Sequence, residues 1–223
     1  MIEFLHEHGG QLMSKTLEHF YISIVALLLA IIVAVPIGIL LSKTKRTANI
    51  ILTVAGVLQT IPTLAVLAIM IPIFGVGKTP AIVALFIYVL LPILNNTVLG
   101  VQNIDSNIKE AGKSMGMTRN QVLRMIELPL SVSVIIGGIR IALVVAIGVV
   151  AVGSFIGAPT LGDIVIRGTN ATDGTTFILA GAIPIAIIAI VIDVLLRFLE
   201  KRLDPTTRHR KNQSNHRPQS INM

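Results

Sequence analysis

The chain has 223 residues, of which 53% are hydrophobic and only 13% are charged, and its formal net charge is +7. With a mean hydropathy of +0.84, it is far more apolar than an ordinary soluble domain, so we expect a membrane protein. The basic residues lie in short flanks beside apolar stretches, which argues against nucleic acid as a partner, and the absence of cysteine excludes a thiolate metal site and a cysteine nucleophile.

Five apolar stretches are long enough to cross a hydrocarbon core of about 30 Å, which takes roughly 20 helical residues. The stretches are continuous rather than alternating, so we expect helices and not barrel strands. The predicted fold is therefore an all-α, polytopic membrane protein whose transmembrane domain covers residues 1–203. The five predicted spans are Leu17–Leu41, Ile50–Phe74, Ala81–Val101, Val132–Ile156 and Phe177–Phe198.

Proline occurs inside four of the five predicted spans, as Pro36, Pro62, Pro72, Pro92 and Pro184. A break in a helix at membrane depth is tolerated where neighbouring helices or a water-lined path receive the freed carbonyl groups. Kinked helices suit a protein that moves a substrate, although proline is also commoner in membrane helices than in soluble ones.

The distribution of Lys and Arg between the loops predicts the orientation, because loops rich in these residues stay in the cytoplasm. Thirteen of them fall in the first loop, the third loop and the C-terminal tail, and only Lys15, Lys78 and Arg167 fall on the opposite side. We therefore expect the N-terminus outside and the C-terminus inside. The tail over residues 204–223 is polar and basic, so we expect it to be disordered, and either inert or in contact with anionic membrane lipid.

The polar segment between the third and fourth spans, residues 103–130, predicts two short helices rather than an irregular loop. Asp105 or Ser106 is a suitable N-cap for the first helix. Gly116 can end that helix in a left-handed turn, which glycine adopts without steric cost.

The second helix of this segment has a start signal and a stop signal of its own. Thr118 and Gln121 have the spacing of a capping box, in which each side chain satisfies an exposed amide of the other residue. We expect Pro129 to stop the helix. Two capped helices of this kind form a hairpin that can move as one rigid body and transmit force.

The same segment contains a spaced motif: Glu110-Ala111-Gly112, then Gly116, nine intervening residues, and Ile126-Glu127-Leu128-Pro129. This pattern resembles the cytoplasmic coupling loop of bacterial binding-protein-dependent ABC importer permeases. The resemblance implies their fold, with a methionine-importer-like core, and a location in the bacterial plasma membrane. It also implies a noncatalytic subunit without a cofactor, because ATP and Mg bind the partner ATPase.

Carried over by position, the resemblance assigns a set of residues to the contact with the ATPase. The small residues among them allow close approach of another surface, although Gly112 replaces the second Ala of the usual motif, at a cost of up to about 1 kcal/mol in a helix. The alternative is an amphipathic connector on the membrane surface. The assigned residues are Glu110, Ala111, Gly112, Met115, Gly116, Met117, Leu128 and Pro129.

Nearly the whole chain is similar to the permeases of osmoprotectant importers, which take up glycine betaine, carnitine and choline. This resemblance implies two ABC ATPase subunits, a second permease chain (identical or sister) and an extracellular substrate-binding protein as partners. One departure is Pro159-Thr160, where relatives commonly show Gly-Gly, so the flexibility of that outer loop is in question. The similar stretches include Gly56–Pro62, Pro80–Leu85, Leu91–Thr97 and Phe155–Ala158.

Polar side chains and helix breaks at membrane depth are candidates for a water-lined translocation path, because burying a polar group in lipid is costly. Gln59 and Thr60 are the first candidates, with a hydrogen bond between helices and no substrate contact as the alternative. We also expect Asp193 to form an ion pair with Arg197, four residues later on one helix. The full set of path candidates is Gln59, Thr60, Pro62, Asn95 and Asn96.

The chain itself is poorly equipped to select a quaternary ammonium, which is usually held in a cage of aromatic rings. It has no Trp, two Tyr and seven Phe. The resemblance assigns selection to the binding protein instead. Two alternatives remain: the same type of permease with methionine or another amino-acid derivative as cargo, and an ion-coupled secondary transporter, whose usual repeated halves and midplane charges are not visible here.

Overall fold

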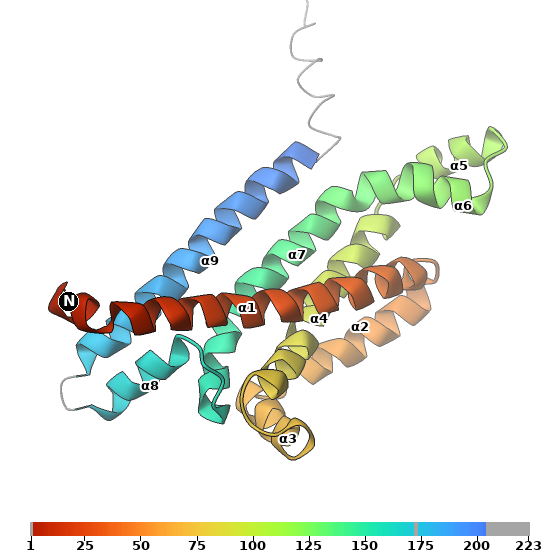
Figure 1. Ribbon diagram of the computed structural model, residues 1–223. Helices are drawn as coiled ribbons and strands as arrows, with labels where there is room; N and C mark the ends of the chain where they lie inside the picture. Colours follow the sequence, from red (N-terminus) through yellow and green to blue (C-terminus); the bar gives the residue numbers. More distant parts are fainter. Residues whose placement is uncertain (1, 172–173, 204–223) are drawn as a thin grey trace, which may run out of the picture.

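The computed structural model describes residues 2–171 and 174–203, and their regular structure is entirely helical (Figure 1). The all-α prediction is confirmed, while the predicted tail, residues 204–223, lies outside the described residues. The elements in chain order are α1 (Ile2–Leu41), α2 (Lys45–Gln59), α3 (Thr63–Phe74), α4 (Lys78–Gln102), α5 (Ser106–Ser114), α6 (Arg119–Val122), the π-helix η1 (Leu123–Glu127), α7 (Leu128–Val150), the 3₁₀-helix η2 (Ala151–Ile156), α8 (Gly162–Asn170) and α9 (Thr175–Leu203).

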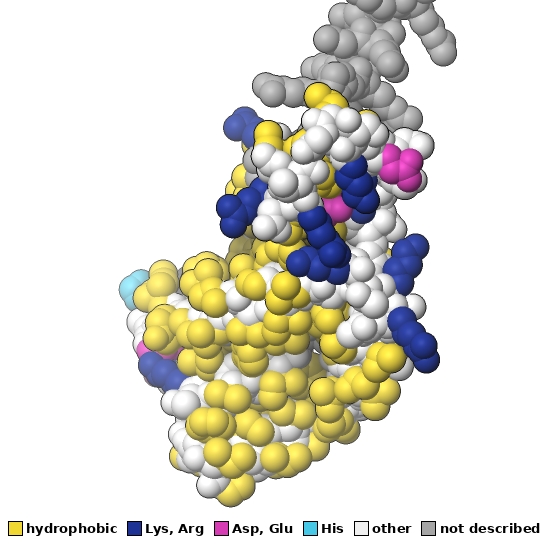
Figure 2. Space-filling view, turned by 90° about the vertical axis from the view of Figure 1, so that its right-hand side faces the viewer, with side chains coloured by type: hydrophobic (Ala, Val, Ile, Leu, Met, Phe, Trp, Pro, Cys, Tyr) yellow, Lys and Arg dark blue, Asp and Glu magenta, His cyan; other side chains and the backbone are white. Residues whose placement is uncertain are grey.

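Four helical runs in the described part of the chain are long and apolar enough to cross a bilayer. They contain the first, third, fourth and fifth predicted spans, which are confirmed. Large apolar side chains on these runs point outward: Ile32 is 68% exposed and Ile190 is 63% exposed. Figure 2 shows such side chains as a broad yellow surface, with Lys and Arg gathered above it. Extensive exposed apolar surface is expected where lipid, not water, surrounds the protein. The four runs are His6–Leu41, Lys78–Gln102, Arg119–Ile156 and Thr175–Arg202.

The second predicted span, Ile50–Phe74, is wrong as a continuous helix. It is divided into α2 and α3, which meet at 89° and form either a broken span or a re-entrant loop. Pro62 causes the break, because it has no amide hydrogen and its ring disfavours helical backbone at the residue before it. α2 therefore closes with a tight bond from the amide of Thr60 to the carbonyl of Val57 (3.0 Å).

α4 is the central helix of the bundle and packs against both α1 and α7. Glycine allows the close approach on each side. A Cβ atom at Gly38 of α1 would lie 2.7 Å from Thr97 Cβ, and one at Gly138 of α7 would lie 2.5 Å from Asn96 Cβ. In lipid the hydrophobic effect does not drive helices together. Close van der Waals contact, which small residues permit at these two crossings, stabilises the packing instead.

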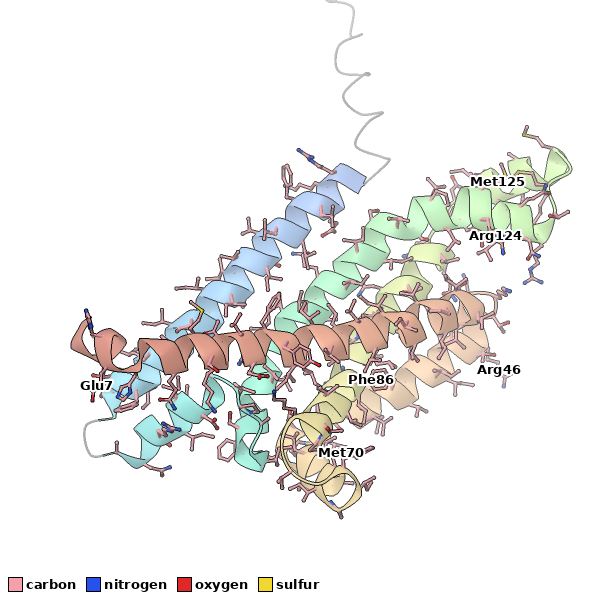
Figure 3. All side chains as sticks on the ribbon, in the orientation of Figure 1. Glu7, Arg46, Met70, Phe86, Arg124 and Met125 are labelled. Carbon is pink, nitrogen blue, oxygen red and sulfur yellow. The ribbon has the colours of Figure 1, made fainter. Side chains whose placement is uncertain are left out.

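The two ends of the bundle differ in charge. The N-terminus and α8 lie at one end of the molecule, and the turn between α1 and α2 lies at the other, together with α5 and α6 (Figure 1). Arg46 and Arg124, which the orientation prediction assigns to the same side, lie at this second end, whereas Glu7 lies at the first (Figure 3). α8 was not predicted, because its short polar sequence was assigned to an outer loop.

Candidate functional site

The predicted hairpin is formed by α5, α6 and η1 and projects from one end of the bundle (Figure 1). Both predicted caps are confirmed. A carboxylate oxygen of Asp105 accepts a hydrogen bond from the amide of Asn107 at 2.9 Å and so caps α5. The amide of Thr118 donates to the side-chain oxygen of Gln121 at 2.8 Å, and the amide of Gln121 donates to the Thr118 hydroxyl at 3.4 Å, which completes the capping box.

Gly116 makes the turn of the hairpin, as predicted. Its φ is +82°, in the left-handed region. The amide of Gly116 donates to the carbonyl of Lys113 at 2.9 Å, and the amide of Met117 donates to the carbonyl of Gly112 at 3.2 Å. These two bonds form a Schellman motif, which satisfies the last carbonyls of α5.

Gly112 does not lie on an exposed surface of the hairpin, where the expected contact with the ATPase would place it. Gly112 is buried between the two arms of the hairpin, and a Cβ atom there would lie 2.7 Å from Ile126 Cδ1 and 3.2 Å from Met117 Sδ. The side chain of Val122 packs beside it and is itself buried. The glycine therefore makes room for the opposite arm of the hairpin and not for a partner.

Three of the other assigned residues are exposed on the hairpin, whereas Met117 packs against Gly112. Glu110 lies two residues from Gly112, about 200° around α5, so it points away from the buried side. Ala111 and Met115 are exposed, Met115 by 83%. Two exposed apolar side chains of the hairpin were missed, because neither belongs to the spaced motif: Ile108 (44%) and Met125 (67%, labelled in Figure 3).

Pro129 does not stop the second arm, contrary to the prediction. η1 runs directly into α7, with the amide of Leu128 donating to the carbonyl of Leu123 five residues earlier. This wider π turn leads to Pro129 in the first turn of α7, where a missing amide hydrogen costs least. Leu128 is partly buried and Pro129 is exposed. The second arm is therefore the start of the membrane-spanning run Arg119–Ile156.

Lys109 joins the hairpin to the bundle. Its ammonium group lies 3.5 Å from a carboxylate oxygen of Glu127 on η1 and donates to the carbonyl of Val101 near the end of α4 at 3.0 Å. One side chain thus connects α5, η1 and α4, and the hairpin cannot rotate freely about the ends of the helices.

One path candidate beside the break between α2 and α3, Gln59, is hydrogen-bonded to α4. The side-chain amide of Gln59 donates to the carbonyl of Tyr88, and the Tyr88 hydroxyl donates to the carbonyl of Ile61. This connection supports the alternative in which Gln59 bonds two helices. Thr60 and Pro62 are exposed beside it.

The path candidates on α4 lie apart from the break. Asn96 donates to the carbonyl of Pro92 at 2.8 Å and lines a cavity of about 350 Å³ together with Arg140 and Glu200. None of the residues that the structure places around this cavity belongs to the α2–α3 break. Asn95, the next residue on α4, is partly buried. The structure therefore does not gather the five path candidates around one opening within this chain.

Charged side chains connect α7 with α9. Arg140 lies 2.9 Å from a carboxylate oxygen of Asp193 and 3.1 Å from one of Glu200. The predicted pair of Asp193 with Arg197 is confirmed at 3.3 Å. Glu200 was not identified from the sequence, because its partner Arg140 is sixty residues away in the chain.

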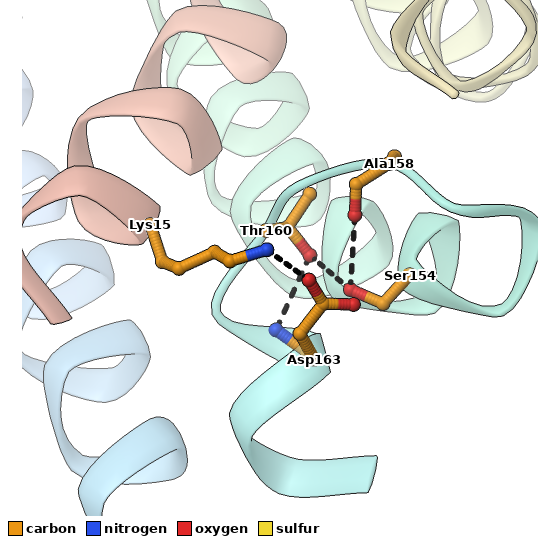
Figure 4. Close-up of polar contacts among 6 residues, drawn as sticks. Lys15, Ser154, Ala158, Thr160 and Asp163 are labelled. Carbon is orange, nitrogen blue, oxygen red and sulfur yellow. Dashed lines mark hydrogen bonds and ion pairs between the residues drawn. The ribbon is translucent and has the colours of Figure 1, made fainter. Parts of the chain in front are cut away.

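The outer loop around Thr160 is held by side-chain hydroxyls (Figure 4). Thr160 is fully buried; its Oγ1 lies 2.6 Å from Ser154 Oγ and accepts from the amide of Gly162 at 3.2 Å. Lys15 of α1 forms an ion pair with Asp163 in the first turn of α8. The threonine at this position thus gives the loop two bonds that a glycine could not.

The known proteins to which this chain is similar are membrane components of transport systems. The family model described as "binding-protein-dependent transport system inner membrane component" matches residues 18–205. The chain is 49% identical over 211 residues to the carnitine transport permease OpuCD of Listeria monocytogenes (strain 10403S), covering 95% of each chain. It is 46% identical over 209 residues to the glycine betaine/carnitine/choline permease OpuCD of Bacillus subtilis (strain 168), covering 94% of this chain and 91% of the relative.

A solved structure shares the fold. The MetNI methionine ABC transporter in inward-facing conformations superposes with a TM-score of 0.80 at 20% identity, covering 88% of this chain and 98% of the transporter chain. The predicted methionine-importer-like core is therefore confirmed. The apolar spans and the bacterial relatives place the protein in the bacterial plasma membrane as a multi-pass protein. Since both the family model and the relatives match it over most of its length, the chain belongs to the binding-protein-dependent transport system inner membrane components, the permease subunits of ABC importers.

Proposed function

We propose that this permease serves an ATP-driven importer of quaternary-ammonium osmoprotectants such as glycine betaine, carnitine and choline. The observation that carries the substrate class is the 49% identity, over 95% of both chains, to a carnitine permease. Methionine or another amino-acid derivative is the second candidate cargo, supported only by the shared fold at 20% identity. An ion-coupled transporter is the least supported reading.

The chain is noncatalytic in this proposal, and ATP and Mg bind two partner ATPase subunits. The hairpin is the contact between the permease and the ATPase. Its surface presents the carboxylate of Glu110 and the exposed side chain of Met115, which α5 and its C-cap hold in a fixed relation. Because the second arm continues into a spanning helix, a displacement of the hairpin moves that helix as well. The other contact residues are Ala111, Met117, Leu128 and Pro129, with Gly112 as internal packing.

A second permease chain, identical or sister, completes the membrane part. An apolar cavity of about 490 Å³ lies open between α7, α8 and α9 and is lined by small residues such as Gly148, Ala182 and Ala186. Small side chains permit close approach of another helix in lipid, which supports a protein neighbour at this place. An extracellular binding protein delivers and selects the substrate.

The translocation path remains a proposal. Thr60 and Pro62 are exposed at the α2–α3 break, and Asn95 is partly buried on α4. The side-chain amides of Gln59 and Asn96 each donate one hydrogen bond to a backbone carbonyl, which leaves one N–H and the side-chain oxygen of each for a substrate. A path with so few polar contacts binds its cargo weakly, and weak binding favours release.

Reconstitution of the complete transporter in proteoliposomes tests the proposal. We expect uptake of labelled carnitine to require internal ATP and the binding protein, and to be inhibited by glycine betaine or choline but not by methionine. Uptake driven by an ion gradient without ATP would show an ion-coupled transporter. Inhibition by methionine alone would transfer the proposal to the second candidate cargo.

The hairpin contact has its own test. We expect Glu110→Lys to abolish substrate-stimulated ATP hydrolysis and to weaken copurification of the ATPase, because the reversed charge lies on the contact surface. Glu7→Lys is the matched control, since Glu7 is also exposed but lies at the opposite end of the molecule (Figure 3). It should leave copurification of the ATPase unchanged. Normal stimulation in Glu110→Lys would refute the contact.

A further inference from the structure

A basic cavity lies behind the hairpin, on the side facing the bundle. Its volume is about 540 Å³, and it separates the hairpin from the turn after α1 and the end of α4. Four cationic side chains and one carboxylate line it: Lys43, Lys109, Lys113, Arg119 and Glu127. The cations come from three segments, namely the α1–α2 turn, α5 and α6.

Three of the four positive charges in this cavity have no ion-pair partner among the described residues. Glu127 lies 3.5 Å from Lys109, so that pair is internally balanced. Within residues 2–171 and 174–203, no carboxylate lies within ion-pair distance of Lys43, Lys113 or Arg119. Like charges that converge on a concave space focus a positive potential into it and favour an anion.

The depth of the cavity indicates where the anion comes from. α1 ends at Leu41, directly before the cavity, and Val101 in its wall is one residue from the end of α4. The apolar length of both helices ends here, and the predicted orientation therefore puts the cavity at the level of the lipid headgroups of the cytoplasmic leaflet. Gln102 fixes this wall by donating from its side chain to the carbonyl of Ser42 at 3.3 Å. Phosphate groups of anionic lipids in the cytoplasmic leaflet lie at this depth and attract basic side chains.

We propose that the cavity binds a phosphate group, supplied by the headgroup of an anionic phospholipid of the cytoplasmic leaflet. Arg119 presents several parallel N–H donors to the phosphate oxygens, and the ammonium groups of Lys43 and Lys113 add point charges. The bound phosphate connects the α1–α2 turn to the hairpin and removes the repulsion between them. Its effect on coupling rests on the proposed function of the hairpin.

Lipid binding to the assembled, full-length transporter tests the site. Phosphatidylglycerol and phosphatidylcholine are titrated into the detergent-solubilised complex, and bound lipid is counted by native mass spectrometry. The cavity variant is Lys43→Gln with Lys113→Gln and Arg119→Gln. The control variant loses the same charge at exposed positions outside the cavity wall: Lys45→Gln with Arg46→Gln and Arg124→Gln. A third variant, Lys43→Arg with Lys113→Arg, keeps the charge and checks that the fold tolerates substitution here.

We expect phosphatidylglycerol, but not phosphatidylcholine, to bind the wild-type complex, and the cavity variant to bind it on the order of 100-fold more weakly. The control and charge-keeping variants should bind like wild type. Equal weakening in the cavity and control variants would overturn the proposal, since it would show attraction by surface charge alone. Inorganic phosphate that competes with the lipid would support recognition of the phosphate group, whereas phosphate binding without lipid binding would refute the lipid source.

An acidic segment of the ATPase is the other possible occupant of a basic cavity. A cavity variant that binds phosphatidylglycerol like wild type but retains less ATPase would assign the cavity to that segment and overturn the proposal. Because the lipid titration does not involve transport, its outcome is separate from the proposed function. If the lipid site is confirmed and Glu110→Lys still couples normally, the hairpin assignment fails and the lipid site stands.

Discussion

The side-chain amide of Gln59 donates a hydrogen bond to the main-chain carbonyl of Tyr88 at 2.5 Å. Tyr88 lies four residues before Pro92 in α4, so its carbonyl has lost the helical donor that any other residue at 92 would supply. The Tyr88 hydroxyl in turn donates to the carbonyl of Ile61 in the α2–α3 break. Pro92 leaves the Tyr88 carbonyl without its helical donor. The end of α2, just before the break at Pro62, supplies the missing hydrogen bond.

Gln59→Leu should destabilise the protein by about 1–3 kcal/mol, because it leaves the carbonyl of Tyr88 without a donor in a nonpolar environment. Thr60→Val is the matched control, since the Thr60 hydroxyl is exposed and bonds only to the nearby carbonyl of Val57. Thermal unfolding in detergent measures both. We expect a clear decrease in the unfolding midpoint for Gln59→Leu and little change for Thr60→Val.

A double-mutant cycle separates this role of Gln59 from a contact with substrate. Pro92→Ala restores the amide that can bond to the carbonyl of Tyr88 within α4. In that background Gln59→Leu should cost less by about 1 kcal/mol, because the carbonyl already has a donor. An undiminished cost, together with a changed KM for uptake, would contradict the structural role and favour the path assignment.

The sequence predicted the regular helices well, because their signals are local. Apolar runs of membrane length indicated five spans, four of which are continuous helical runs, and the caps of the hairpin followed from Asp105, Thr118 and Gln121. The two errors in where a helix is interrupted or ends both concern proline. Pro62 breaks its span and Pro129 does not end its helix, and the sequence alone does not distinguish these outcomes. The difference depends on the neighbours: Tyr88 is placed to bond to the broken segment, and the π turn of η1 accommodates Pro129.

Gly112→Ala should be tolerated in the hairpin, whereas Gly112→Leu should separate its arms. A new Cβ atom would lie 2.7 Å from Ile126 Cδ1, the flexible end of a side chain that can move aside. Ala is favoured over Gly in a helix by up to about 1 kcal/mol, which offsets that displacement. A leucine side chain has no such room. Ala111→Leu, at the exposed neighbouring position, controls for bulk.

Hydrogen exchange of the hairpin amides and substrate-stimulated ATP hydrolysis measure these variants. We expect fast exchange and lost stimulation for Gly112→Leu, and near wild-type exchange for Gly112→Ala and Ala111→Leu. If the hairpin of Ala111→Leu exchanges like wild type, its substrate-stimulated ATP hydrolysis also tests the proposed contact, because Ala111 lies on the proposed contact surface. Slow, native exchange in Gly112→Leu would contradict the internal packing.

Arg140→Met should destabilise the contact between α7 and α9 by about 1–3 kcal/mol. The change leaves Glu200 without its partner and Asp193 with only the exposed Arg197, whereas Arg140 now lies 2.9 Å from Asp193 and 3.1 Å from Glu200. Arg197→Met is the control on the same helix, because Arg197 is 59% exposed and its ion pair is screened by solvent. Its expected effect is under about 0.5 kcal/mol.

Adding Asp193→Asn and Glu200→Gln to Arg140→Met should recover most of the lost stability, because the cost comes from unpaired carboxylates and not from lost packing. Unfolding midpoints of the single and triple variants test this. A triple variant as unstable as Arg140→Met alone would mean that the aliphatic part of the arginine side chain stabilises the contact.

In the candidate site, too, the sequence predicted the features that depend on nearby residues and missed those that depend on distant ones. The sequence predicted the turn at Gly116, which is formed with residues a few positions away. The burial of Gly112 depends on the opposite arm, and the basic cavity depends on Lys43, more than sixty residues before the hairpin in the sequence. No local pattern connects such residues, because the connection is made only when α1 and α4 pack side by side.

Thr160→Val should loosen the outer loop. The variant keeps the volume of the side chain but loses the hydroxyl, which accepts from the amide of Gly162 at 3.2 Å and pairs with Ser154 Oγ at 2.6 Å in a fully buried position. Loss of a buried hydrogen bond of about 1 kcal/mol increases local opening about fivefold to tenfold. We expect the amide of Gly162 to exchange faster by this factor. Thr169→Val, whose exposed hydroxyl bonds to the carbonyl of Ile166, should exchange like wild type there, and Thr160→Ser should retain most of the protection. Wild-type exchange in Thr160→Val would show that packing around the loop, and not the hydroxyl, keeps it closed.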